Sequence, residues 1–113
     1  MKPIERIAQL HTLGKQYAKA KAECEHLKHF RKSKLAILKA HFAQEDSKRS
    51  NAACDDLARA HPQYIELLDG LKVAIEVSEA ALWELKTSHA GINIWQTQRA
   101  DERAEIKLNS GIT

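Results

Sequence analysis

One short stretch of the sequence carries residue types that bind metal ions. Glu23 and His26 have the Glu-x-x-His spacing, and His29 lies about one helical turn beyond His26. Carboxylate-bridged di-metal bundles use this motif on each of two helices. The later histidines, His61 and His89, have no glutamate three residues before them. The motif is therefore half present, and we predict no metal site and no cofactor.

Cys24 and Cys54 are the candidate nucleophiles. Cys24 falls on an apolar helical seam, where a thiol is buried and inert, and Cys54 precedes two carboxylates, which disfavour the reactive thiolate. Neither lies near a glycine-rich turn that could stabilise an oxyanion. Two cysteines do not form a disulfide framework, so we expect reduced thiols that pack as small apolar side chains. No catalytic residue is predicted, and the protein is not expected to be an enzyme.

Positive charge is concentrated at the start of the chain. Residues 1–43 hold ten Lys and Arg against three Asp and Glu, a balance of +7. Residues 62–113 hold five against eight, a balance of −3, and the whole chain carries +3. This asymmetry favours an internal antiparallel match, a polyanionic partner, or both.

The basic residues include a row with helical spacing. At 100° per residue, four lysines lie within about 20° of one line along a helix: Lys21, Lys28, Lys32 and Lys39. Such a row could follow a phosphate backbone. A long helix also keeps a charged face toward water, however, and the spacing fits both interpretations. Together with Arg31, these lysines are the predicted nucleic-acid-binding residues.

Arg31 is the more specific member of this set, because it interrupts an apolar seam. A guanidinium at such a position must pair with an acid, extend toward water along its aliphatic stem, or meet a phosphate of a ligand. The sequence leaves all three alternatives open.

The elements that carry these residues are predicted to be helices. Apolar residues make up 43% of the chain, aromatic residues only 5%, and the four glycines and two prolines are too few for the turns of an all-β fold. The predicted fold is all-α and forms a single helical domain over residues 1–113. Its parts are a helix at about 3–43, a connection with a short helix at about 44–60, and a long helix at about 62–108.

Local signals set the expected ends of these helices. Pro3 and Pro62 suit the first turn of a helix, where no N–H donor is needed. Ser50 or Asn51 can cap the short middle helix. Asn109-Ser110-Gly111 is a typical stop signal, and it predicts that the long helix ends near Leu108.

Both long helices carry an apolar seam with steps of three and four residues, typical of coiled-coil-like pairing. In the first helix the seam is Leu10, Leu13, Tyr17, Ala20, Cys24 and Leu27, and it resumes after Arg31 as Leu35, Leu38 and Phe42. In the second it is Tyr64, Leu67, Leu71, Ala74, Ser78, Ala81, Leu85, Ser88, Ile92 and Trp95. The steps around Arg31 form a stutter, which locally unwinds a supercoil. The seams predict a long antiparallel helical hairpin with a short middle helix.

The second long helix has more apolar surface than its seam. Five further side chains widen the apolar arc to about 200°, roughly twice the stripe of a simple surface helix: Ile65, Leu68, Ile75, Leu82 and Trp83. Either the middle helix or a second copy of the chain must cover this surface. Two long helices bury only a ribbon between them, which favours a homodimeric helical bundle with these five residues at its interface. Trp83 and Trp95 could instead stack on unpaired bases.

Nothing in the sequence points to a membrane or to export. The first six residues mix both charges and no apolar segment follows them, so no signal peptide is predicted. The longest apolar runs are four residues, far short of the roughly 20 that a membrane span needs. We therefore expect a cytoplasmic protein without membrane contact.

Three stretches resemble small helical proteins that tailed phages and prophages encode in their early regions, near recombination or replication genes. These stretches are Phe30-Arg31-Lys32-Ser33-Lys34-Leu35-Ala36, the segment from Ala60 to Leu71, and Trp95-Gln96-Thr97. The resemblance covers most of the chain and implies a setting, the host bacterial cytoplasm during infection. It carries no catalytic residue.

Two functions are compatible with these features. The first is a non-enzymatic accessory protein of phage recombination or replication that binds single- or double-stranded DNA, or a DNA-processing protein, through its basic helix. The alternative is a protein-binding inhibitor of a host enzyme or defence complex that has no DNA contact. In the alternative, the apolar surface around Ile75, Leu82 and Trp83 would carry the interaction.

Overall fold

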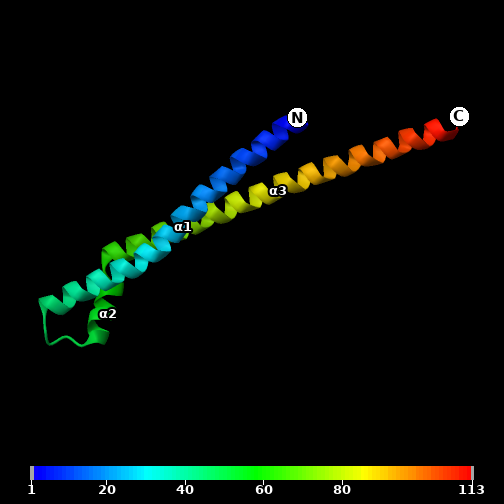
Figure 1. Ribbon diagram of the computed structural model, residues 1–113. Coiled ribbons are helices and arrows are strands. Elements are labelled where there is room, and N and C mark those ends of the chain that lie inside the picture. The colour runs from blue at the N-terminus through cyan, green and yellow to red at the C-terminus, as the bar shows by residue number, and fades with distance from the viewer. Residues whose placement is uncertain (1, 113) are drawn as a thin grey trace. The chain divides into compact units, whose positions relative to one another are not determined.

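The computed structural model describes residues 2–112, and three helices account for nearly all of them. They are α1 (Pro3–Glu45), α2 (Asn51–Arg59) and α3 (Pro62–Ile112), in the order shown in Figure 1. The part of the chain that is described contains no strand. The prediction of an all-α helical hairpin with a short middle helix is thus confirmed.

The helices begin where the sequence predicts, but two of them end later. α1 starts at Pro3 and α3 at Pro62, as expected for a residue that lacks an N–H donor. α1 ends at Glu45 rather than near residue 43, and α3 passes through Asn109-Ser110-Gly111 to Ile112. The predicted stop was wrong because the preference of these residues for a helix end is weak. Residues 96–110 of this last part of α3 are exposed to solvent.

The described residues divide into two compact units. The first holds the start of α1 (residues 2–17) with the later part of α3 (residues 80–112), and the second holds residues 18–79. The second unit contains the rest of α1, the whole of α2 and the first turns of α3. The basic row and the main hydrophobic cluster both lie in this second unit.

The predicted seams are the buried faces of both long helices. Every seam position from Leu10 to Phe42 on α1, Arg31 included, is buried or half-buried. The same holds for every seam position from Tyr64 to Trp95 on α3. Alternating steps of three and four residues keep one stripe of a helix turned toward its partner, which explains this agreement.

The core of the second unit lies where its three helices meet. Leu38 of α1, Ala58 of α2 and Tyr64 of α3 form a buried cluster, and Ala58 is fully inaccessible to solvent. Three half-buried side chains pack against the cluster: Leu35, Phe42 and Leu68. A methyl group at position 58 lets α2 approach the other helices closely, so the middle helix closes this end of the seam.

The connection before α2 is held by specific polar contacts. Arg49 donates to the carbonyl oxygen of Phe42 at 3.1 Å, and its guanidinium lies 5.6 Å from the centre of the Phe42 ring. Ser50 has an extended backbone, and its hydroxyl oxygen accepts a hydrogen bond from the Ala53 N–H at 3.1 Å. Ser50 is therefore the N-cap of α2, one of the two residues predicted for this role.

Replacing Ser50 by alanine is expected to lower the free energy of unfolding by about 1 kcal/mol, because the Ala53 N–H loses its acceptor. Urea denaturation of both proteins measures the change. Ser47→Ala is the matched control, since Ser47 is exposed in the same connection and outside the cap. Equal losses in the two variants would contradict the assignment of the cap.

Candidate nucleic-acid interface

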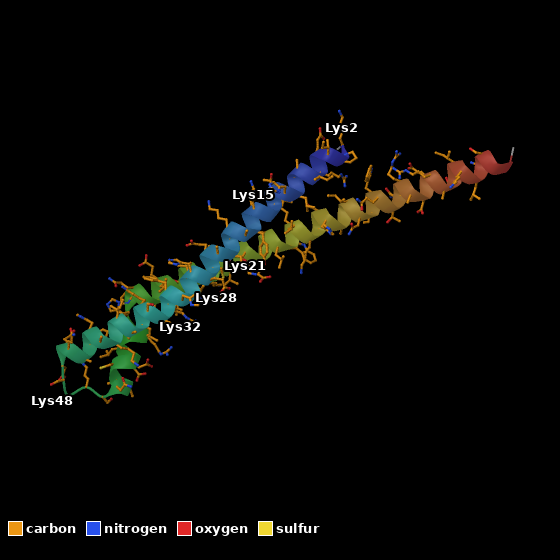
Figure 2. All side chains as sticks on the ribbon, viewed as in Figure 1. Lys2, Lys15, Lys21, Lys28, Lys32 and Lys48 are labelled. Atoms are coloured by element: carbon orange, nitrogen blue, oxygen red, sulfur yellow. The ribbon has the colours of Figure 1, made fainter. Side chains whose placement is uncertain are left out.

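The predicted basic row lies on one side of α1 within the second unit. Lys21, Lys28 and Lys32 are exposed and follow one another along the helix (Figure 2), whereas Lys39 is half-buried. A helix repeat of 3.6 residues brings the four positions onto one side, as the sequence indicates. Three of the four ammonium groups can thus meet a ligand from water.

Two members of the row have acidic neighbours. The Lys28 ammonium lies 3.3 Å from a carboxylate oxygen of Glu25, and both side chains are about half exposed. An exposed pair of this kind contributes at most about 1 kcal/mol, so Lys28 can exchange its partner for a phosphate. Lys39 lies 3.7 Å from Asp55 of α2. This pair joins α1 to α2, so Lys39 belongs more to the fold than to a ligand site.

Arg31 lies on the seam and is half-buried, as predicted. Within residues 2–112, its guanidinium has no hydrogen bond and no ion pair, so the first of the three alternatives, pairing with an acid, is not realised. Two surface hollows adjoin Arg31 and Lys32. One is also lined by Glu25, Lys28, His29, Leu71 and Ile75. The other is also lined by Leu35, Arg59 and Tyr64.

The second hollow includes a cation that the sequence did not assign to the site. Arg59 lies at the end of α2, and its Nε donates to Asp55 Oδ2 at 2.9 Å. The spacing of four residues is a normal helical pairing and could be read from the sequence. The proximity of Arg59 to Arg31 could not be read from the sequence, because it depends on how α2 packs.

The carboxyl group of Asp55 is held in its ionised form by these cations. The hydrogen bond from Arg59 lowers the pKa of Asp55 below its ordinary value of 3.8, and the charges of Arg59 and Lys39 add to this effect. Partial desolvation acts in the opposite direction and is outweighed. The same hydrogen bond raises the pKa of Arg59. Asp55 thus fixes the position of Arg59 beside the hollow.

The stabilisation that Asp55 provides is expected to disappear in acid. Because its pKa is lower in the folded chain than in the unfolded one, the ionised carboxylate stabilises the fold above the ordinary pKa of 3.8. This contribution is lost as the pH falls through the lowered value. The melting temperatures of the wild type and Asp55→Asn, followed from neutral pH to about pH 2, should therefore converge at the acid end. A constant difference between the two curves would contradict this role.

Within residues 2–112, the half-motif for metal binding gains no further ligands. Glu23, Glu25, His26 and His29 are exposed on α1, where Glu25 meets Lys28 and the ring of His26 stacks on Phe30 at 6.2 Å between centroids. Over the described residues, no group of three or more His, Cys, Asp or Glu side chains is placed to hold a metal ion. Cys24 and Cys54 are both buried free thiols.

The predicted interface residues of α3 are divided between covered and exposed positions. Leu68 packs against the core cluster, and Leu82 is half-buried. Ile65, Ile75 and Trp83 are 47%, 39% and 73% exposed. The core where the three helices meet thus covers Leu68, and Ile65, Ile75 and Trp83 remain accessible. Trp95 is half-buried on the seam.

No protein-family model, no curated protein and no solved structure matches this chain. Among the described helices, none combines the length and the apolar character needed to cross a membrane. The class that the fold defines is an all-α helical hairpin with a short middle helix, and this hairpin exposes basic side chains on α1 and apolar side chains on α3.

Proposed function

We propose that this chain is a non-enzymatic nucleic-acid-binding protein that acts as an accessory factor in phage recombination or replication. Its contact surface is Arg31 together with the basic row of α1, which consists of Lys21, Lys28, Lys32 and, at its edge, Lys39. The resemblance of the sequence to early-region phage proteins supports the setting, the host bacterial cytoplasm. One observation supports this surface: among residues 2–112 no acidic side chain pairs with Arg31 or Lys32, and both adjoin two hollows.

The energetics of such a surface are those of a polyanion binder. Lysine and arginine neutralise phosphates and release condensed counterions, so affinity falls steeply as salt rises. A line of lysines along one side of a helix suits contact with successive phosphates, and phosphate contacts carry no sequence information. Binding is therefore expected to be weak, tolerant of sequence and sensitive to salt.

Fluorescence anisotropy with labelled single- and double-stranded oligonucleotides, at about 50 mM and about 200 mM salt, tests this function. The double variant Lys28→Glu with Lys32→Glu should abolish most of the binding at the lower salt concentration. Lys48→Glu with Lys107→Glu is the matched control, because it changes the net charge equally at exposed lysines outside the row. Figure 2 shows Lys48 in the connection before α2, away from the labelled lysines of the row.

Two results would reject the proposal or its surface. If the wild type binds no oligonucleotide at the lower salt concentration, nucleic-acid binding is wrong. If the two double variants weaken binding equally, only the total charge matters and the row is not the contact surface.

The exposed apolar residues of α3 favour a second candidate, a protein-binding function. Ile65, Ile75 and Trp83 remain accessible, and a second copy of this chain or a host enzyme could cover them. If the partner is a host enzyme, the chain would be an inhibitor of that enzyme and would not need DNA. The anisotropy measurement separates the two candidates, since this one requires no oligonucleotide binding.

A further inference from the structure

The hollow beside Arg31 and Lys32 that includes Arg59 is built from all three helices of the second unit. α1 provides Arg31, Lys32 and Leu35, α2 provides Arg59, and α3 provides Tyr64. Leu35 and Tyr64 belong to the packed end of the unit, where Tyr64 is buried in the core cluster. The cationic groups are thus arranged on a fixed apolar support.

The charges around this hollow do not balance. In the part of the chain that the structure describes, Arg31 and Lys32 have no hydrogen bond or ion pair from their side chains. Arg59 donates only its Nε to Asp55, which leaves both terminal nitrogens of the guanidinium available. The single carboxylate of Asp55 is also shared with Lys39. Three cations therefore adjoin one hollow. Among the described residues the Asp55 carboxylate is the one acidic group that forms an ion pair with any of them, and the charge of Asp56 acts on Arg59 without an ion pair.

We infer that this hollow binds a phosphate group, which deepens the proposed nucleic-acid-binding function and rests on it. Two guanidinium groups from different helices can donate in pairs to one anion, and a phosphate offers enough acceptor oxygens for both together with an ammonium group. A terminal phosphate has three unbridged oxygens, whereas a carboxylate has only two and satisfies such a set less well. The apolar support lowers the local dielectric and strengthens these contacts.

The phosphate group can belong to a nucleic-acid strand or to a free phosphate ion, and one experiment separates these two sources. The Nε–Hε signals of Arg31 and Arg59 are followed by ¹H–¹⁵N NMR during three titrations. The probes are inorganic phosphate, a short oligonucleotide with a 5′-hydroxyl end, and the same oligonucleotide with a 5′-phosphate. A shift with inorganic phosphate indicates that the hollow binds the free ion. A shift with the 5′-hydroxyl oligonucleotide indicates that it binds a phosphodiester. A shift with the 5′-phosphorylated oligonucleotide alone indicates that it binds a terminal phosphate.

The expected result is a joint shift of both arginine signals with at least one of these probes. A polyglutamate peptide of similar charge serves as the competing probe. If the peptide shifts both signals as strongly as the phosphate probes do, the hollow binds acidic protein segments and the inference is wrong. If neither arginine responds to any phosphate probe, the inference is also wrong.

Conservative variants test the geometry without removing charge. Arg31→Lys and Arg59→Lys keep each positive charge but lose the planar guanidinium group with its paired N–H donors. Each variant should therefore weaken oligonucleotide binding about tenfold. Lys48→Arg is the control, since it alters a cation in the connection before α2, and it should leave affinity unchanged. Circular dichroism of each variant verifies that the helices are intact.

Failure of this inference can be distinguished from failure of the proposed function. If the charge reversal at Lys28 and Lys32 weakens binding but both Arg-to-Lys variants bind normally, the basic row is used and the phosphate hollow is not. If the wild type binds no oligonucleotide and inorganic phosphate shifts neither arginine signal, both proposals are wrong.

Discussion

Replacement of Leu38 by alanine is expected to lower the free energy of unfolding by about 2–5 kcal/mol. Leu38 is 5% exposed and belongs to the cluster in which α1, α2 and α3 meet. The truncated side chain would leave a cavity, because Ala58 and Tyr64 are fixed by the backbones of two other helices. Chemical denaturation followed by circular dichroism, at one fixed protein concentration, measures the loss.

The neighbouring residue provides the control for this prediction. Ile37 is 60% exposed, so Ile37→Ala removes a similar aliphatic side chain from water rather than from the core. Its effect should stay within about 0.5 kcal/mol. Comparable losses in the two variants would mean that the cluster around Leu38 does not carry the stability of the second unit.

Replacement of both Ile65 and Ile75 by glutamate is expected to convert the predicted homodimer into a monomer. The two side chains are exposed on α3 and belong to the predicted interface. Burial of a carboxylate against apolar surface is strongly unfavourable, so the dissociation constant should rise at least 100-fold. Light scattering measures the mass, which should fall from twice 12.8 kDa to 12.8 kDa.

The control for this change lies on the same helix. Val73 is 56% exposed and lies outside the predicted interface, so Val73→Glu should leave the dimer intact. A wild-type chain that is monomeric at every concentration tested would contradict the predicted self-association. Equal dissociation by both variants would place the interface on another side of α3.

The seam was predictable because it depends only on periodicity. Leu13, Cys24 and Leu71 recur at the steps that a pair of packed helices requires, and all three are buried. Arg31 could likewise be placed on the seam from its spacing alone. Local chemistry also identified where two helices start, since Pro62 begins α3 and Ser50 is the N-cap of α2.

The features that the sequence did not predict depend on tertiary packing or on weak preferences. Arg59 adjoins Arg31 only because Ala58 is small enough for α2 to pack against α1 and α3. Lys39 reads as a member of the basic row, but the packing of α2 brings Asp55 to it. The end of α3 was misplaced because a preference worth less than about 1 kcal/mol decides it.

Ile75 lines the same hollow as Lys28 and Lys32. A nucleic-acid strand that lies across these lysines would cover part of Ile75. A second copy of the chain that packs against Ile75 would cover part of the lysines. The two complexes would then compete for one surface, and thermodynamic linkage requires each to weaken the other by the same factor. The concentration of this protein in the cell would then decide which complex forms. As the concentration rises, the homodimer would accumulate and the bound polyanion would be released.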